Sequence, residues 1–132
     1  MLKRPNPATG STFKAPRKPL PKRAAAHRTG QTQQRRVYAA LDAESDGRCC
    51  GCGGTWFLTH SHCYSQKQYP EHRNDPRNIL ILCVNCHALY ENNKPKFRRV
   101  CAEAWAETLR RMKEVDKAAF LRFQTLNTHL FT

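Results

Sequence analysis

Residues 49–57 read CCGCGGTWF, and residues 79–86 read ILILCVNC. Each stretch contains one Cys-x2-Cys pair, and the two pairs are formed by Cys49, Cys52, Cys83 and Cys86. At this spacing one tight turn can direct two sulfurs at the same ion, so two turns fill the four positions of tetrahedral zinc. The sequence therefore predicts a closed, structural Zn²⁺ site that joins two distant parts of the chain.

The other three of the seven cysteines are interpreted differently. Cys50 is the alternative to Cys49, but only Cys49 has the spacing to Cys52 that a single turn requires. Cys63 and Cys101 fit ordinary buried thiols, because free cysteine commonly packs as a small apolar side chain. A redox dithiol is the alternative for either pair alone, whereas two pairs together favour a metal site.

The length and charge of the chain limit its function. Its 132 residues make one ordinary domain, which excludes a two-domain enzyme. Lys and Arg number 23 against 10 Asp and Glu, and the resulting net charge of +13 favours nucleic acid as the partner. No apolar run approaches the roughly 18 residues that span a bilayer. We therefore expect a soluble, cytoplasmic protein with no membrane partner.

Residues 1–36 form a basic segment that contains ten Lys and Arg, five Pro and no acid. Such a composition cannot bury a core, so we expect a disordered arm that becomes ordered on the phosphates of DNA. The residues expected to contact DNA in this arm are Lys14, Arg17, Lys18, Lys22, Arg23, Arg35 and Arg36. A solvated, solubilising tail is the alternative interpretation.

The remaining chain divides into a core at 37–95 and C-terminal helices at 96–132. A helix is expected over about 32–45, with Thr32 as its N-cap. The β-rich residues after the first cysteine pair predict a hairpin, and the polar residues 66–78 predict a loop.

Helical patterns follow the second cysteine pair. A short helix is expected from His87 to about Asn92, before Pro95. Further on, apolar residues recur at steps of three and four, which predicts one amphipathic helix that covers the core. These residues are Phe97, Cys101, Ala104, Trp105, Leu109 and Met112.

Histidines accompany both cysteine pairs. His60 and His62 alternate along the expected strand, so both imidazoles point to one face, and His87 directly follows Cys86. Glu91 lies four residues after His87, which places a carboxylate and an imidazole on the same side of a helix. This grouping favours a catalytic divalent cation, such as Mg²⁺ or Mn²⁺, beside a histidine that accepts a proton from water.

Three segments together resemble the zinc-containing branch of the HNH endonuclease family: CCGCG at 49–53, LTHSH at 58–62 and NILILCVNCH at 78–87. The resemblance covers about residues 35–95. It implies an α+β fold, in which a small ββα-metal core is stabilised by the four-cysteine zinc site and flanked by helices. Small HNH proteins with basic tails resemble those of bacteriophages and mobile elements, which places the expected activity in a bacterial host cell.

The resemblance also implies roles for individual residues. His62 would be the general base, Asn78 would pin the loop that orients it, and His87 would bind the catalytic cation. The implied function is that of a metal-dependent endonuclease that hydrolyses phosphodiester bonds of DNA. Without the resemblance, Asn78 would be interpreted as an ordinary turn residue.

The chain departs from the family at one position. The family commonly has Asp or His immediately before the base, as a second ligand of the cation, and this chain has Ser61 there. His60 or Glu91 would then take the place of the missing ligand. Alternatively, His60 is the base and His62 is the ligand.

Four arginines outside the arm are expected to clamp phosphates next to the cleaved bond: Arg73, Arg77, Arg98 and Arg99. The rival interpretation is a non-catalytic zinc-knuckle protein that binds DNA or RNA. Such a protein would need the cysteines and the basic residues, but it would not need the grouping of histidines with Asn78.

Overall fold

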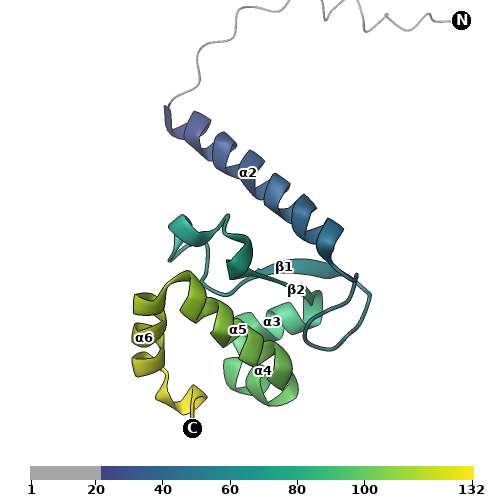
Figure 1. Ribbon diagram of the computed structural model, residues 1–132, viewed down its shortest axis with the longest axis vertical. Coiled ribbons are helices and arrows are strands. Elements are labelled where there is room, and N and C mark those ends of the chain that lie inside the picture. Colours follow the sequence, from purple (N-terminus) through teal and green to yellow (C-terminus); the bar gives the residue numbers. More distant parts are fainter. Residues whose placement is uncertain (1–21) are drawn as a thin grey trace, which may run out of the picture.

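The computed structural model describes the backbone of residues 22–132 and the side chains from residue 32 onward (Figure 1). The fold is α+β and mostly helical, with one two-stranded sheet. The helices and strands are α2 (Lys22–Glu44), β1 (Leu58–His62), β2 (Ile79–Cys83), α3 (Val84–Asn92), α4 (Lys94–Val100), α5 (Ala102–Val115) and α6 (Lys117–Leu126). Short 3-10 turns occur at η1 (Pro70–His72), η2 (Pro76–Asn78) and η3 (Thr128–Leu130).

The sheet pairs β1 with β2 in antiparallel orientation, in a register that places Leu58 opposite Cys83 and His62 opposite Ile79. The predicted local hairpin is therefore wrong, since the partner of β1 follows the long polar segment. Strand β1 also begins only at Leu58, because Phe57 takes a left-handed backbone conformation with φ of 49°.

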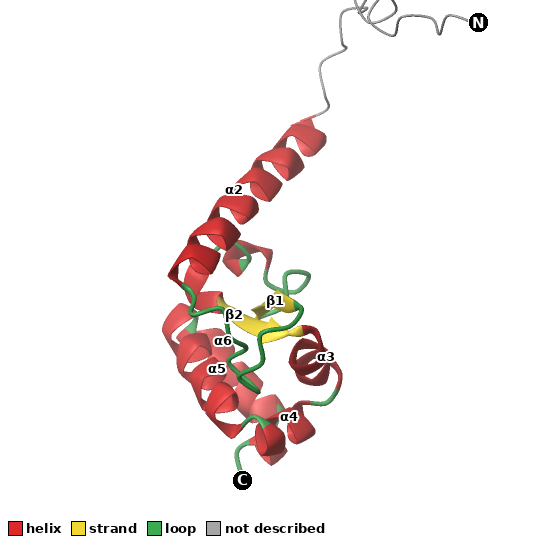
Figure 2. Cartoon of the chain, turned by 90° about the vertical axis from the view of Figure 1, so that its right-hand side faces the viewer, coloured by secondary structure: helices red, strands yellow, loops and turns green. Residues whose placement is uncertain are grey.

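Helix α3 follows β2 without a loop and lies against the strands (Figure 2). It begins at Val84, three residues before the predicted start, because Cys83 acts as its N-cap: the Cys83 sulfur accepts a hydrogen bond from the N–H of Cys86 at 3.4 Å. The second cysteine pair therefore lies at the junction of a strand and a helix.

One hydrophobic core joins the sheet to the C-terminal helices. Tyr90 of α3 packs on Phe97 of α4 with ring centroids 5.3 Å apart, and Phe97 packs on Trp105 of α5 at 6.4 Å. Phe97 is completely buried. The same cluster includes Leu82 of β2, so residues on both sides of the predicted boundary at 95 and 96 form one unit.

The predicted C-terminal amphipathic helix is two helices, because the chain bends at Cys101. This residue ends α4 by donating its N–H to Phe97 O at 2.7 Å, and it begins α5 by accepting from Trp105 N at 2.9 Å. Its φ of −116° and ψ of 55° are not helical. The bend buries the Cys101 side chain, which is 4% exposed.

Helix α2 begins at Lys22, ten residues before the predicted start at 32. Thr32 therefore lies inside the helix and is not an N-cap, and the part of the predicted disordered arm from residue 22 to 36 is helical. The sequence offers a local reason for this earlier start. Pro21 is the last proline of the basic segment 1–36, and three alanines, which are strong helix formers, follow at 24–26. Figure 1 shows α2 as a long helix that extends from the rest of the fold.

Helix α5 holds the segment that precedes β2. The Arg111 guanidinium donates to Pro76 O at 3.3 Å and to Ile79 O at 3.1 Å, on either side of Asn78. Glu107 orients that guanidinium by accepting from its Nε at 2.8 Å. Hydrogen bonds from Arg110 and Arg111 hold the pKa of Glu107 at about 2, so its carboxylate stays charged at neutral pH.

We predict that Glu107→Gln lowers the free energy of unfolding at neutral pH by about 0.5–1 kcal/mol, the range typical of partly exposed ion pairs. The loss should shrink in about 1 M salt, because screening weakens the pair that orients Arg111. Thermal unfolding measures both effects. Glu103→Gln changes an exposed acid one turn earlier in α5 and is the control. Equal stability of the two variants would contradict this role of Glu107.

Candidate metal centre and histidine site

Four cysteine sulfurs from three elements meet at one point. The Sγ atoms of Cys49, Cys52, Cys83 and Cys86 all lie within 4.8 Å of one another. The sulfurs of Cys52 and Cys83 are 3.7 Å apart. This separation matches the ~3.8 Å edge expected for sulfurs placed about 2.3 Å from a tetrahedral zinc ion. The cluster can therefore hold a metal ion such as zinc.

Backbone N–H groups support the sulfurs of the first pair. Cys49 Sγ accepts from Gly51 N at 3.2 Å and from Cys52 N at 3.5 Å. Burial opposes ionisation of Cys49, but hydrogen bonds from the backbone at Cys83, Cys52 and Gly51 outweigh it and lower the pKa of the thiol to about 7. Because thiolates are the form that binds metal, this turn favours a metal-binding state.

Close packing at the centre requires glycine at position 51. A Cβ atom at Gly51 would lie 3.0 Å from Cys86 Sγ and 3.2 Å from Cys101 Sγ. Cys101 is thus a buried neighbour of the cluster, as the sequence analysis expects of an ordinary thiol. Cys50 is exposed and lies outside the cluster, and burial raises the pKa of Cys63 to about 12.

A second group of three donors within 4.8 Å is found in the described part of the chain, and it consists of Glu71, His72 and Asp116. His72 Nε2 donates to Asp116 Oδ2 at 2.9 Å. The other oxygen of Asp116 accepts from Ala119 N at 3.0 Å and caps α6. These contacts explain the grouping as a structural link between η1 and α6.

His87 lies in α3 with one ring nitrogen fixed by the sheet. Its Nδ1 is 2.8 Å from Thr59 Oγ1, and that hydroxyl donates its single hydrogen to Leu82 O at 2.8 Å. Nδ1 of His87 must therefore donate, which leaves the lone pair of the neutral ring on Nε2. Nε2 faces Glu91 Oε1 at 3.5 Å. A nitrogen lone pair and a carboxylate side by side are suited to a divalent cation.

His62 is buried at the end of β1, with 5% of its surface exposed. Its Nε2 lies 2.9 Å from Arg73 O, and because a carbonyl only accepts, Nε2 carries the hydrogen. Nδ1 is then the basic nitrogen of the neutral ring. Burial is the largest influence on the pKa of His62 and lowers it, and this outweighs the hydrogen bond to Arg73 O, which raises it. The ring is therefore neutral at neutral pH, the form that can act as a base.

Asn78 holds the loop that provides the Arg73 carbonyl. Its Oδ1 accepts from Tyr64 N at 2.8 Å, and its Nδ2 donates to Tyr64 O and to His72 O, each at 3.1 Å. Asn78 is completely buried. The side chain thus connects Tyr64, which follows the end of β1, to His72, the residue just before Arg73. The expected role of Asn78 in orienting a catalytic base stays a prediction.

The contacts of His60 differ from those expected of a ligand of the catalytic cation. Its Nε2 is 2.8 Å from Asp42 Oδ1, and its ring stacks on Tyr38 with centroids 3.9 Å apart and planes 8° apart. Both partners belong to α2. His60 does share a strand face with His62, whose ring lies 6.2 Å from the same tyrosine. No group of donors within 4.8 Å unites His60 with His87 and Glu91 among the residues described.

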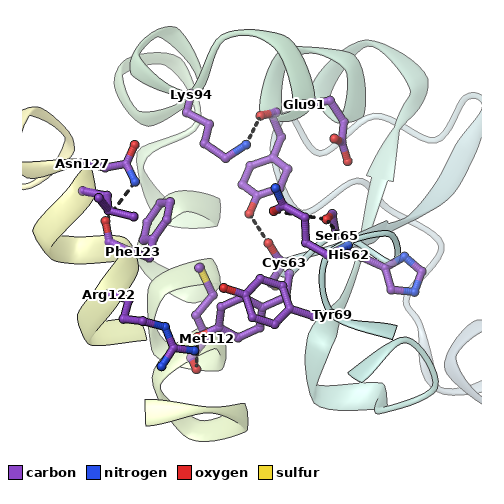
Figure 3. Close-up of a pocket in the computed structure, with 14 residues that line it drawn as sticks. His62, Cys63, Ser65, Tyr69, Glu91, Lys94, Met112, Arg122, Phe123 and Asn127 are labelled. Atoms are coloured by element: carbon purple, nitrogen blue, oxygen red, sulfur yellow. Dashed lines mark hydrogen bonds between the residues drawn. The ribbon is translucent and has the colours of Figure 1, made fainter. Parts of the chain in front are cut away.

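A cavity of about 470 Å³ adjoins His62, between the end of β1 and helices α3, α5 and α6 (Figure 3). Its lining includes Tyr69, Lys94, Arg122 and Phe123. In Figure 3 the imidazole of His62 points away from these side chains. The proton-accepting edge of His62 therefore does not face this cavity.

The basic residues predicted to bind DNA have different surroundings. Lys14, Arg17 and Lys18 lie outside the described residues, and Lys22 and Arg23 lie in the part of α2 where only the backbone is described. Arg35, Arg36 and Arg99 are exposed.

Two of the remaining arginines make internal contacts. Arg77 pairs with Asp75 at 2.7 Å. Arg98 donates to His129 O at 3.1 Å and to Thr132 O at 2.6 Å, so its guanidinium holds the C-terminal residues instead of pointing freely to solvent. Its predicted role at phosphates stays a prediction. These contacts could not be foreseen from the sequence, because the two acceptors are distant backbone oxygens.

Comparison with protein-family models, with curated proteins and with solved structures found no match for this chain. The search of the described residues for a membrane span found no helix with the length and apolarity that a bilayer crossing needs.

We predict that the purified protein contains about one tightly bound metal ion per chain, because four thiolates leave no coordination position open. Cys52→Ser should lower both the metal content and the thermal stability, whereas Cys50→Ser, at the exposed neighbouring cysteine, should change neither. Elemental analysis and thermal unfolding measure these effects. Folded wild-type protein without metal, or equal metal content in the two variants, would contradict the assignment.

Proposed function

We propose that the protein is a metal-dependent nuclease that hydrolyses phosphodiester bonds of DNA. The observation that supports this most directly is the environment of His62. Its imidazole is buried, bound through Nε2–H to the Arg73 carbonyl, and held in the neutral form by its lowered pKa. A histidine held in one tautomer, with Nδ1 as its basic nitrogen, suits general-base activation of water.

His87 and Glu91 would hold the catalytic cation of this nuclease. When bound, a divalent cation supplies Lewis-acid stabilisation to negative charge on a phosphate oxygen. Thr59 fixes the hydrogen of a neutral His87 ring on Nδ1, so that Nε2 is directed at the Glu91 carboxylate. His62 takes the proton of the attacking water at Nδ1, while Asn78 prevents the loop that carries Arg73 from shifting.

The proposal includes zinc at the four cysteines and a ββα-metal core around it. The order of β1, β2 and α3 matches the element order of that fold, and the sulfur separation of 3.7 Å suits zinc. In this arrangement zinc is structural, and only the cation at His87 takes part in the reaction.

DNA is the proposed substrate because of charge. The chain has a net charge of +13, and Arg35, Arg36 and Arg99 are exposed for contact with phosphates. A polyanion gains affinity from such cations through release of counterions. The basic residues thus favour binding along the nucleic-acid backbone.

A non-catalytic protein that binds DNA or RNA is the second candidate. One observation favours it: His87 and Glu91 do not form a group of three donors with a further residue within 4.8 Å in the described chain. Water and phosphate oxygens would have to complete the coordination of a catalytic cation.

We predict that His62→Ala lowers the rate of DNA cleavage about 10² to 10⁴-fold, the typical contribution of a general base, while DNA affinity stays within about twofold. The measurement is nicking of supercoiled plasmid in Mg²⁺ or Mn²⁺, together with filter binding. His129→Ala, at an exposed histidine in η3, is the control. If wild-type protein binds DNA and cuts no substrate form with any divalent ion, the nuclease proposal is wrong and the binding protein replaces it.

We predict that His87→Ala also abolishes cleavage, but for a different reason, the loss of a ligand to the cation. Raising the Mn²⁺ concentration should therefore restore part of the activity of His87→Ala and none of the activity of His62→Ala. Equal restoration in the two variants would contradict the separate roles.

We predict that kcat/KM of the wild-type protein falls with decreasing pH only below the ordinary histidine pKa of about 6.5. Burial lowers the pKa of His62, so the ring remains a neutral base down to a lower pH than an exposed histidine. Cleavage rates between pH 5 and 8 test this. A decline that is half complete above pH 7 would contradict a buried histidine base.

A further inference from the structure

Two adjacent aromatic side chains project from the segment between the first cysteine pair and β1. Trp56 and Phe57 are each 76% exposed, whereas the other tryptophan, Trp105, is 5% exposed. The residues occur in a β-rich stretch, where the sequence analysis expects them to pack in a hairpin. Large aromatic side chains are costly to leave in water, so a pair of them at one exposed site indicates contact with a partner.

The backbone holds this pair in a defined position. Phe57 has a φ of 49°, a conformation that residues with a Cβ rarely adopt. Its carbonyl accepts from Val84 N at 2.9 Å, and Leu58, the next residue, pairs with Cys83. The segment is therefore attached to the residues of the second cysteine pair, and in Figure 1 the connection from α2 to β1 runs at the edge of the fold, next to α3.

The ring geometry leaves aromatic faces available. The ring centroids of Trp56 and Phe57 are 6.4 Å apart and the planes are tilted by 45°, so the rings do not cover each other by stacking. The neighbouring Val84 is 50% exposed and extends the apolar surface. Each ring can thus accept a flat group on its face.

The size and charge of this aromatic surface favour nucleic acid over a protein as its partner. Two rings and one valine are far smaller than the roughly 800 Å² that each side of a stable protein interface buries. Between Asp46 and Glu71 the sequence has no acid, and it has Arg48 and Lys67, so a polyanion can approach without repulsion from this segment. Flat, apolar groups attached to a polyanion are the bases of nucleic acid.

We propose that Trp56 and Phe57 form a stacking platform for unpaired bases of single-stranded DNA. Stacking on exposed aromatic rings tolerates any base sequence, because every base has a π face. The inference rests on the proposed function in one respect, that DNA is the partner. It adds a substrate preference: DNA with single-stranded segments, such as branched or partly unwound duplexes, should bind better than intact duplex.

The fluorescence of Trp56 tests the platform directly. In full-length Trp105→Phe protein, Trp56 is the only tryptophan, so its emission reports on base stacking. We expect an oligothymidylate of about 12 nucleotides to quench this emission by more than half, at site sizes typical of such proteins. An abasic oligonucleotide of the same length has the same phosphates and should cause little quenching. Equal quenching by the two would overturn the proposal.

Wild-type protein provides the second measurement and avoids any effect of Trp105→Phe on folding. We expect Trp56→Ala with Phe57→Ala to weaken binding of the oligothymidylate roughly 5- to 150-fold for each stacked base. Affinity for the abasic oligonucleotide should stay within about twofold. Leu126→Ala removes an 80% exposed leucine from α6 and is the control. If the double variant binds oligothymidylate like wild type, the platform does not exist.

These assays are done in EDTA-free buffer without added Mg²⁺ or Mn²⁺, so they separate stacking from cleavage. Base-dependent quenching without cleavage under any condition would support the platform and refute the nuclease. Cleavage that requires His62 but is unchanged in the double variant, with no base-dependent quenching, would refute the platform and support the nuclease. Quenching by neither oligonucleotide, with cleavage also absent, would overturn both.

Discussion

The cluster of four cysteine sulfurs is the constraint on which the rest of the structure depends. It connects the turn after α2 to the junction of β2 and α3. Because Leu58 pairs with Cys83, the position of the cluster also determines the register of the sheet, and with it the place of His62 opposite Ile79. Burial and the neighbouring sulfurs raise the pKa of Cys86, so its thiolate is disfavoured in the absence of a cation. A cation bound by the four sulfurs would stabilise that thiolate.

Asn78 is the second point on which the site depends. A completely buried amide is stable only when its donors and acceptors are satisfied, and Asn78 binds backbone groups of Tyr64 and His72. Helix α5 reinforces the same segment through Arg111, which donates to the carbonyls of Pro76 and Ile79. The C-terminal helices therefore do more than cover the core, because they stabilise the loop that orients His62.

Helix α2 is attached to the sheet near its C-terminal end and carries exposed basic residues. Its last turns attach to the sheet through Tyr38 and Asp42, both on His60, while Arg35 and Arg36 remain exposed. Under the proposed function, nucleic acid contacts Arg35 and Arg36 of α2, His60 attaches α2 to the sheet and His62 performs the chemistry.

Local spacing in the sequence was sufficient to predict the cysteine cluster and the pairing of His87 with Glu91 in one helix. Each of these depends on a tight turn or on one helical turn. The expected place of Asn78 came from the family resemblance, because local spacing alone indicates an ordinary turn residue. Tertiary structure decided the partner of β1, the bend at Cys101, the hydrogen bond between His60 and Asp42, and the hydrogen bonds of Arg98 to the C-terminal residues. These features depend on contacts between residues far apart in the chain, where burial and satisfaction of backbone groups outweigh the local pattern. The exposure of Trp56 and Phe57 belongs with them, because their β-rich sequence predicts extended structure, whereas the left-handed conformation of Phe57 delays the start of β1 to Leu58.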